Sequence, residues 1–550
     1  MKKNNILLFI FIFLTIFISC REELPQISIL DPSMGIMGEI LTIRGTGFGN
    51  DRNESYITIA GTSPTSSSYI SWTNNEIIVR TPEFGNSGLV YVHRGRNTSN
   101  PAIFGNRHYL PIPVSYTDGN NPRITDIQPS SGPIGTLITI QGNNFGSARG
   151  NGGVFFAWES ESSLTSDFYS DFIEVSEREF GYEFWSEREI RIRVPDGAVS
   201  GNIELRTSRG NSQPVYFEVT GRPGTKVFTN RQNIVINYSA ELSVYNASLP
   251  NSLFIWMPRP VISSSQRNPF LEHRNIEPFI ENYQGTSLYH LMDLPSNSRR
   301  TINFSYLVEV YETETTIRSQ TSVRLNAPSP VSTYYIHPSP LIPSDDSIIR
   351  GRSTEIIARE TQLYARARLI YNWLISAVEI EFNENNIVPE SSEITTPLML
   401  LHTALEERSM DNYTAALLFT SLARAAGIPA IPVSGVIINR NMQAFNHYWA
   451  EFWIDGFGWI PVDPALGAGA VPPEFLLRED HQNYYFGNLD NQRLAFSRGE
   501  HVLLQMTPQG RITSYNRMYS LQNMWEEAVG GLDSYSSVWS NVIITGLYIQ

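Results

Sequence analysis

The chain has 550 residues, which is too many for a single hydrophobic core, so several domains are expected. It carries 40 Lys and Arg against 54 Asp and Glu, a net charge of −14. An acidic surface repels phosphate backbones and no run of basic residues offsets it, so the composition argues against a nucleic-acid partner.

Residues 1–20 have the pattern of a bacterial export signal. Lys2 and Lys3 precede an apolar run that is too short to span a bilayer, and the run ends in "FISC" at Cys20, the only cysteine. This ending resembles a lipobox, with Phe17 where Leu is usual. The resemblance implies lipidation of Cys20 and a membrane-anchored lipoprotein of the cell envelope, facing the periplasm or the cell surface. The alternative is an ordinary signal peptide with an incidental cysteine.

An internal repeat follows this segment. "PQISILDPSMGIMGEILTIRGTGFG" begins at Pro25 and "PRITDIQPSSGPIGTLITIQGNNFG" begins at Pro122, a displacement of 97. The ends, "WTNNEIIVRTP" and "WSEREIRIRVP", are displaced by 113, so the second copy carries 16 extra residues around 158–180. Alternating apolar and polar residues with Gly and Pro between them predict strands and turns. Gly45 and Gly142 are predicted to need a positive φ.

These repeats resemble the IPT/TIG family of immunoglobulin-like sandwiches, at residues 24–117 and 121–220. The resemblance implies two all-β domains that act as spacers or binding surfaces and carry no chemistry. Three aromatic residues of the extra segment are candidate partner contacts, with an ordinary packed loop as the alternative: Phe168, Tyr169 and Phe172.

The second half of the chain changes from strands to helices. Residues 226–325 alternate as strands and resemble the β-domain that often precedes a transglutaminase-like core. Residues 326–344 hold five prolines and are predicted to form a linker. Residues 345–510 are predicted to be α+β, with a helix that begins at Ser353 as N-cap, and residues 511–550 are a C-terminal extension.

Two motifs carry the resemblance to a transglutaminase-like, papain-related core: "LARAAGIPAIPVSGV" and "HYWAEFWIDGFGWIPVDPA". The resemblance implies a Cys that opens a helix, a His that begins the next strand, and an Asp within V-D-P. His447 and Asp463 match, while the Cys position is Asn412. An amide has no ionisable nucleophile. Asp411 or Asn412 is predicted to be the N-cap of this helix, and Asn412 is interpreted as such a cap rather than as a catalytic residue. Hydroxyl groups lie nearby on Ser409 and Thr414.

Three functions remain open from the sequence. The favoured one is a non-catalytic core that binds a peptide, glycan or protein. The alternatives are an acyltransferase or peptidase with a nucleophile other than Cys, and a structural envelope protein in which His447 and Asp463 only hold strands together. Trp449, Trp453 and Trp459 are candidates for lining a groove or for core packing. No cofactor and no metal site are expected. An exposed His447 would favour binding or catalysis, and a buried one a structural role.

Overall fold

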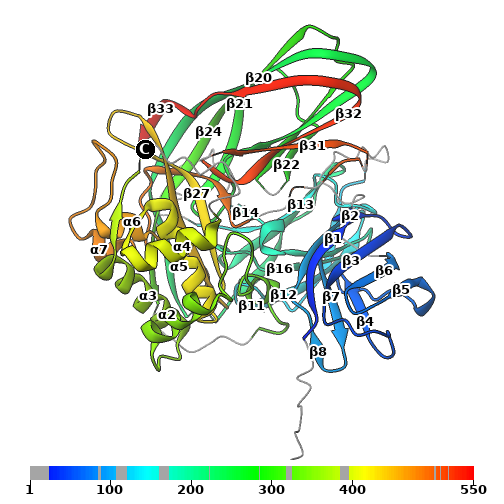
Figure 1. Ribbon diagram of the computed structural model, residues 1–550, viewed down its shortest axis with the longest axis horizontal. Coiled ribbons are helices and arrows are strands. Elements are labelled where there is room, and N and C mark those ends of the chain that lie inside the picture. The colour runs from blue at the N-terminus through cyan, green and yellow to red at the C-terminus, as the bar shows by residue number, and fades with distance from the viewer. Residues whose placement is uncertain are drawn as a thin grey trace, which may run out of the picture.

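Strands form most of the protein, and the longer helices gather between residues 330 and 484 (Figure 1). The structure is a computed structural model. It describes residues 24–549 except 84–87, 107–119, 160–171, 222, 284, 318–324, 384–395, 501–502, 504, 508 and 518. The segment that ends at Cys20 lies outside these residues. Among the described helices, none has the length and apolar character needed to cross a bilayer.

The first repeat forms a sandwich of two sheets, ordered β1-β3-β6-β5 and β2-β9-β7-β4. Alternate side chains of its strands fill the space between the sheets, as the period of two predicts. Its elements are β1 (Gln26–Asp31), β2 (Met34–Gly35), β3 (Ile40–Thr46), β4 (Tyr56–Ile59), η1 (Ser66–Ser68), β5 (Tyr69–Trp72), β6 (Glu76–Arg80), β7 (Gly88–Arg94), β8 (Asn97–Thr98) and β9 (Ala102–Asn106).

The second repeat has the same plan with one more strand, in sheets ordered β10-β12-β16-β15 and β11-β19-β17-β13-β14. The extra strand is β14 (Phe172–Glu174), which pairs with β13 (Gly153–Ala157). Phe172 begins β14, whereas Phe168 and Tyr169 lie outside the described residues. The other elements are β10 (Arg123–Gln128), β11 (Ser131–Gly132), β12 (Leu137–Asn143), η4 (Glu177–Glu179), β15 (Tyr182–Trp185), β16 (Glu189–Arg193), β17 (Gly201–Thr207), β18 (Gly210–Asn211) and β19 (Val215–Val219).

The glycines matched between the two repeats serve two purposes. Gly38 and Gly135 have φ of +86° and +87°, a left-handed backbone that favours glycine. Gly45 and Gly142 lie within β3 and β12, each beside a register shift in the pairing with the partner strand. They are not among the residues with positive φ, so the prediction of a positive φ for them was wrong. A Cβ atom at Gly142 would overlap the carbonyl oxygen of Arg123, and Gly45 meets the partner strand in the same way. Both positions therefore need glycine because two backbones approach closely.

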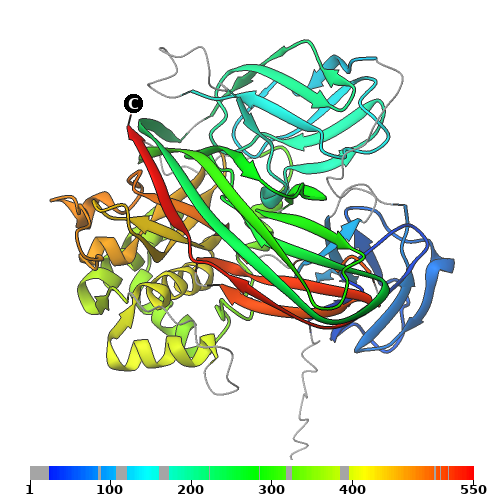
Figure 2. The same cartoon turned by 90° about the horizontal axis from the view of Figure 1, so that it is seen from above.

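Residues 226–325 and the C-terminal extension belong to one sheet. Long strand β20 (Gly224–Pro258) pairs with β24 (Ser298–Ile317) and also with β32 (Ser520–Trp539) and β33 (Ile543–Ile549). Figure 2 shows these C-terminal strands in red against the green strands of the sheet. The remaining strands are β21 (Gln266–Arg274), β22 (Ile280–Tyr283), β23 (Thr286–Met292) and β31 (Arg511–Arg517). The β-domain is therefore built from two distant parts of the chain.

The proline-rich segment 326–344 is packed structure, although its composition predicted a linker. It contains helix α1 (Pro330–Tyr334), and Val331 and Tyr335 are buried. The Tyr335 hydroxyl donates a hydrogen bond to the carbonyl of Arg178 in the second sandwich, at 3.2 Å. The segment therefore fills the junction between the second sandwich and the core.

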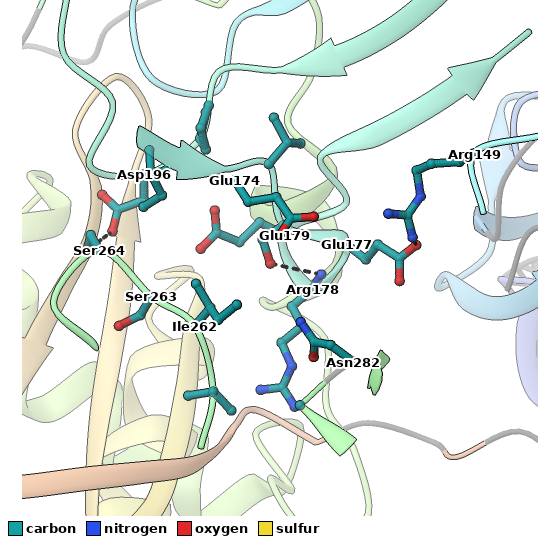
Figure 3. A pocket seen from close by; sticks show the side chains of 16 residues that line it. Arg149, Glu174, Glu177, Arg178, Glu179, Asp196, Ile262, Ser263, Ser264 and Asn282 are labelled. Carbon is teal, nitrogen blue, oxygen red and sulfur yellow. Dashed lines mark hydrogen bonds and ion pairs between the residues drawn. The ribbon is translucent and has the colours of Figure 1, made fainter. Parts of the chain in front are cut away.

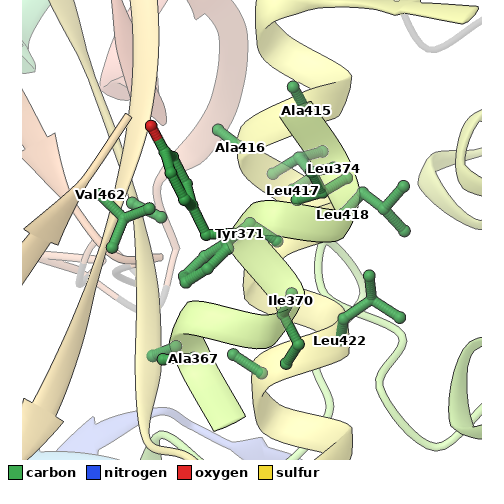
Figure 4. Packing of buried hydrophobic residues seen from close by; sticks show 14 of the residues in the cluster. Ala367, Ile370, Tyr371, Leu374, Ala415, Ala416, Leu417, Leu418, Leu422 and Val462 are labelled. Carbon is green, nitrogen blue, oxygen red and sulfur yellow. The ribbon is translucent and has the colours of Figure 1, made fainter. Parts of the chain in front are cut away.

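The core packs helices against a four-stranded antiparallel sheet ordered β29-β28-β27-β30. The central helix, α5, is buried along nearly its whole length (Figure 4). The helices are α2 (Ser347–Ile357), α3 (Leu363–Ala377), α4 (Pro397–Glu407), α5 (Asn412–Ala425), α6 (Pro464–Ala468) and α7 (His481–Tyr484). The strands are β25 (Glu379–Glu381), β26 (Ser409–Asp411), β27 (Ala430–Ile438), β28 (Ala444–Ile454), β29 (Gly458–Val462) and β30 (Arg493–Arg498).

The predicted start of the first core helix was wrong. Asp346 caps α2 by accepting hydrogen bonds from the backbone N–H groups of Ile348 and Ile349. Ser353 lies inside that helix, where its buried hydroxyl donates to the carbonyl of Leu422 at 2.8 Å. A residue with φ of +49°, Ala358, then separates α2 from α3.

Candidate functional site

The core brings together the three residues that the sequence motifs singled out. Asn412 is the first residue of α5, His447 lies on β28, and Asp463 follows β29 as the N-cap of α6. Helix α5 packs on β28, and β28 pairs with β29, so the three side chains meet where these elements converge.

These side chains form a continuous chain of hydrogen bonds. Asn412 Nδ2 lies 3.3 Å from His447 Nδ1 and 3.4 Å from the carbonyl oxygen of Asn446, and His447 Nε2 lies 2.7 Å from Asp463 Oδ2. A carbonyl oxygen can only accept, which fixes the amide NH₂ rather than its oxygen toward Asn446 and His447. The imidazole therefore accepts at Nδ1 and donates from Nε2 to Asp463, which is its neutral form.

A buried arginine holds the carboxylate at the end of this chain. Arg493 Nη1 donates to Asp463 Oδ2 at 2.9 Å, and Arg493 Nη2 pairs with Asp490 at 2.6 Å. Burial on its own would raise the pKa of Asp463. His447, Arg493 and the N–H of Leu466 outweigh that burial and lower the pKa to about 2. Asp463 is therefore a carboxylate at neutral pH.

The site is closed to solvent. Asn412, His447 and Asp463 each have 0% exposed side-chain surface. The imidazole lies between Phe382 and Trp449, whose ring centroids are 6.1 Å and 6.0 Å away with interplanar angles of 21°. A reagent or substrate would have to displace these groups before it reached Nδ1.

The residues near the expected nucleophile do not supply one. The N-cap of α5 is Asp411, whose carboxylate accepts from Thr414 N at 2.8 Å, so Asn412 is the first helical residue and not the cap. Ser409 is exposed on β26, and Thr414 lies inside the first helical turn. The atom that faces the imidazole is the Asn412 amide nitrogen, whose lone pair is delocalised and cannot attack a carbonyl.

Sequence reasoning missed the two residues that complete the site. Arg493 and Asp490 lie about thirty residues beyond the V-D-P motif, and only the pairing of β30 with β27 brings them to Asp463. A signal did exist, because an Arg in the apolar strand "RLAFS" needs a buried acidic partner. Trp453 and Trp459 pack toward the second sandwich, so they do not line a groove with Trp449.

No group of three or more His, Cys, Asp or Glu with the geometry of a metal site occurs among the residues whose positions are described. The candidate site therefore rests on hydrogen bonds and on one buried arginine.

Sequence comparison identifies the domains. The profile of the transglutaminase-like superfamily matches residues 350–464, and that of the IPT/TIG domain matches residues 25–104 and 122–219. The chain is 26% identical over 201 residues to an uncharacterized protein of Haemophilus influenzae. The match covers 32% of this chain. That match spans about half, 52%, of the Haemophilus protein.

Solved structures give weaker likenesses. A candidate cysteine protease from Cytophaga hutchinsonii has 16% identity and a TM-score of 0.37, covering 59% of this chain and 93% of its own. The periplasmic domain of TgpA from Pseudomonas aeruginosa has 14% identity and a TM-score of 0.25. The match covers 43% of this chain and 89% of the TgpA domain. Such scores do not establish a shared overall fold. The chain is, by its matched domains, a mostly β, multidomain protein with two IPT/TIG immunoglobulin-like domains and a transglutaminase-like core.

Proposed function

We propose that the transglutaminase-like core is non-catalytic and serves as a structural module. The observation that carries this proposal is the Asn412 amide, 3.3 Å from His447 Nδ1 in a site without solvent exposure. Acyl transfer in this fold family would need a thiol that gives its proton to the imidazole and attacks as the thiolate. Here the neighbouring group is a hydrogen-bond donor that occupies the Nδ1 lone pair, so proton abstraction has no partner.

Burial also supports a structural role over ligand binding at the same place. A ligand site is a concave surface with a few polar groups accessible to the ligand, whereas the polar groups of this trio bond to one another. Binding of a peptide, glycan or protein partner would then use another surface of the chain. An acyltransferase with a hydroxyl nucleophile has no comparable support, because neither Ser409 nor Thr414 takes the place of Asn412 beside His447.

The decisive experiment measures acyl transfer of a fluorescent amine to a Gln peptide, together with peptide hydrolysis. The wild-type chain should match a His447→Ala variant at background level. His447-dependent turnover by the wild-type chain would overturn the proposal.

A second measurement checks the geometry on which this proposal rests. In a Cys20→Ala background, Asn412→Cys places a thiol at a helix N-terminus beside an imidazole. These neighbours lower a thiol pKa from about 8.5 to roughly 4–7. Ultraviolet absorbance of the thiolate at pH 6 shows whether the thiol pKa is lowered, and the measurement does not require solvent access to the thiol. Ser421→Cys is the matched control, because Ser421 is also buried in α5. We expect thiolate absorbance for Asn412→Cys alone, and its loss on adding His447→Ala. Equal absorbance from both cysteines would mean that the imidazole does not face position 412.

We also propose that the chain is an exported lipoprotein held at the cell envelope through Cys20. The support is the short apolar run and the position of the single cysteine after Ser19. Radiolabelled palmitate should enter the wild-type protein and not Cys20→Ala. Equal labelling of both proteins would contradict the proposed lipid anchor at Cys20, and it would not affect the proposal for the core.

A further inference from the structure

A second concave site lies away from the core trio, between the two IPT/TIG domains and helix α1. Its volume is about 360 Å³, within the range of small-ligand sites. Tyr91 of the first domain, Phe180 of the second and Thr333 of α1 contribute to its lining. Figure 2 shows the two domains as separate blue and cyan bodies on the same side of the molecule.

The walls of this cleft are fixed to one another. Tyr91 of the first domain and Thr333 of α1 both line the cleft, so the first domain lies beside α1 there. On the opposite wall, the ring of Phe180 packs edge-on against Tyr334 of α1, with centroids 5.3 Å apart. A ligand would therefore meet a preformed site and lose little affinity to ordering the walls.

Two residues of the cleft have a left-handed backbone, as do nine other non-glycine residues elsewhere in the part of the chain that the structure describes. Phe180 and Ala60 line the cleft from different domains, and their φ angles are +51° and +47°. Side chains with a Cβ rarely adopt such angles, and a bulky residue such as Phe does so at a cost of about 1–3 kcal/mol. Phe180 holds this conformation as the C-cap of η4, where its N–H donates to the carbonyl of Glu177.

The polar groups of the cleft indicate the charge of its ligand. Its two charged residues already pair within the second domain: Glu183 with Arg193 at 2.5 Å, and Arg191 with Glu189 at 3.4 Å. The guanidinium of Arg191 also lies over the ring of Phe184, at 4.6 Å. An ionic ligand would have to compete with these internal pairs, so a neutral ligand is favoured.

The other lining groups indicate the ligand's chemistry. Hydroxyl groups come from Thr58, Thr62, Thr333 and Tyr91, and an aromatic surface comes from Phe180. Thr58 Oγ1 already lies 3.1 Å from His93 Nε2, and Thr333 Oγ1 donates to the carbonyls of Ser329 and Pro330, so Thr333 offers a ligand its acceptor lone pairs. The hydroxyls of Thr62 and Tyr91 can both donate and accept, which suits a ligand rich in hydroxyl groups. Aromatic surfaces suit a ligand that also presents apolar C–H faces. We propose that this cleft binds a short neutral oligosaccharide.

The cleft shares no residue with the Asn412–His447–Asp463 trio, so this inference does not depend on whether the core is catalytic. Acyl-transfer assays test the proposal for the core, and sugar-binding assays test the proposal for the cleft. A negative result for one proposal therefore does not affect the other.

Titration calorimetry with the full chain in detergent tests the inference. The probes are maltotriose, cellotriose, xylotriose and tri-N-acetylchitotriose. At least one should bind, and Phe180→Ala should weaken its binding at least tenfold. The matched control is Tyr216→Ala, an aromatic 62% exposed on β19 of the same domain and outside the cleft, which should bind as the wild type does. Thr333→Val, on the opposite wall, should weaken binding several-fold and serves as the second variant if Phe180→Ala is unstable.

Three results would overturn the inference. The first is that no probe binds at millimolar concentration. The second is that Phe180→Ala and Thr333→Val leave the affinity as unchanged as Tyr216→Ala does. The third is that the cleft variants lose binding of a proline-rich peptide or of an acidic trisaccharide while the neutral sugars do not bind.

Discussion

The two IPT/TIG domains share a fold and differ in how they are attached to the rest of the protein. Both pair their first two long strands with the same shift of register, after Ile27 in the first domain and after Ile124 in the second. In the first domain, Met34 packs into a small cluster with Trp256 of the β-domain. The second domain makes buried ion pairs with both the β-domain and the core, and its Trp158 stacks on Phe228 of the β-domain.

One matched position shows the difference directly. Asp196 corresponds to Glu83 at the displacement of 113 that relates the ends of the two copies. Glu83 is exposed, whereas Asp196 is 3% exposed and pairs with Lys226 of β20 at 2.6 Å. The same Lys226 also donates to the carbonyl of Trp459 in the core, at 2.7 Å. Lys226 thus joins three domains, through one ion pair and one hydrogen bond.

The extra residues of the second domain supply the other attachments. The carboxylate of Glu179, in η4, pairs with Arg498 of the core at 3.3 Å. Arg178 crosses toward the β-domain, in a cavity of about 70 Å³ that Ser263 and Asn282 also line (Figure 3). The second domain is therefore attached both through Asp196, at a position that the first domain also has, and through residues of its extra segment.

The largest expected effect follows from removing the ion pair that joins the three domains. Asp196→Ala leaves the ammonium of Lys226 buried without its carboxylate, which should cost about 3–5 kcal/mol. The matched change in the first domain, Glu83→Ala, should stay within about 0.5 kcal/mol, because that side chain is exposed. Hydrogen exchange read by mass spectrometry gives the opening free energy of each domain separately. Equal effects of the two changes would contradict the difference in attachment.

The glycines that approach a partner strand sharpen the same comparison. Gly142→Ala and Gly45→Ala both force a Cβ against a backbone carbonyl, so each should cost about 2–3 kcal/mol. We expect Gly45→Ala to increase exchange in the first domain alone, and Gly142→Ala to increase it in the β-domain and core as well. Gly351→Ala in α2 is the control, since its Cβ meets nothing within 4 Å. Local effects from both strand glycines would mean that the second domain unfolds independently.

The sequence predicted what depends on local pattern. Alternation predicted the sandwich strands, and the displacement of 97 matched residues that hold equivalent register positions. In each case, the signal lies within a few residues of the feature.

Other features depend on pairing between distant segments, which a single sequence does not reveal. Strands β32 and β33 join β20 across nearly three hundred residues, so the C-terminal extension looked like a separate piece. Prolines predicted a linker at 326–344, but burial of Tyr335 decided its conformation. At the site, motifs identified the positions of His447 and Asp463, while Arg493 emerged only from the sheet.

Acid should act on the docked part of the molecule through Asp463. Its folded pKa of about 2 is below its ordinary value of 3.8, so its interactions stabilise the core fully above that ordinary value and are lost as the pH falls toward 2. A shift of this size contributes on the order of 2 kcal/mol. Urea unfolding followed by tryptophan fluorescence at pH 5, 4 and 3 should show the core losing stability over this window. Asp463→Asn should flatten that dependence, because an amide does not titrate, and Glu83→Gln should leave it as in the wild type. Hydrogen exchange at the same pH values compares the domains. If exchange increases in the core and the second domain but not in the first domain, the acid response of a sandwich depends on its attachment to the core and not on its fold. An unchanged slope in Asp463→Asn would assign the acid sensitivity to other carboxylates.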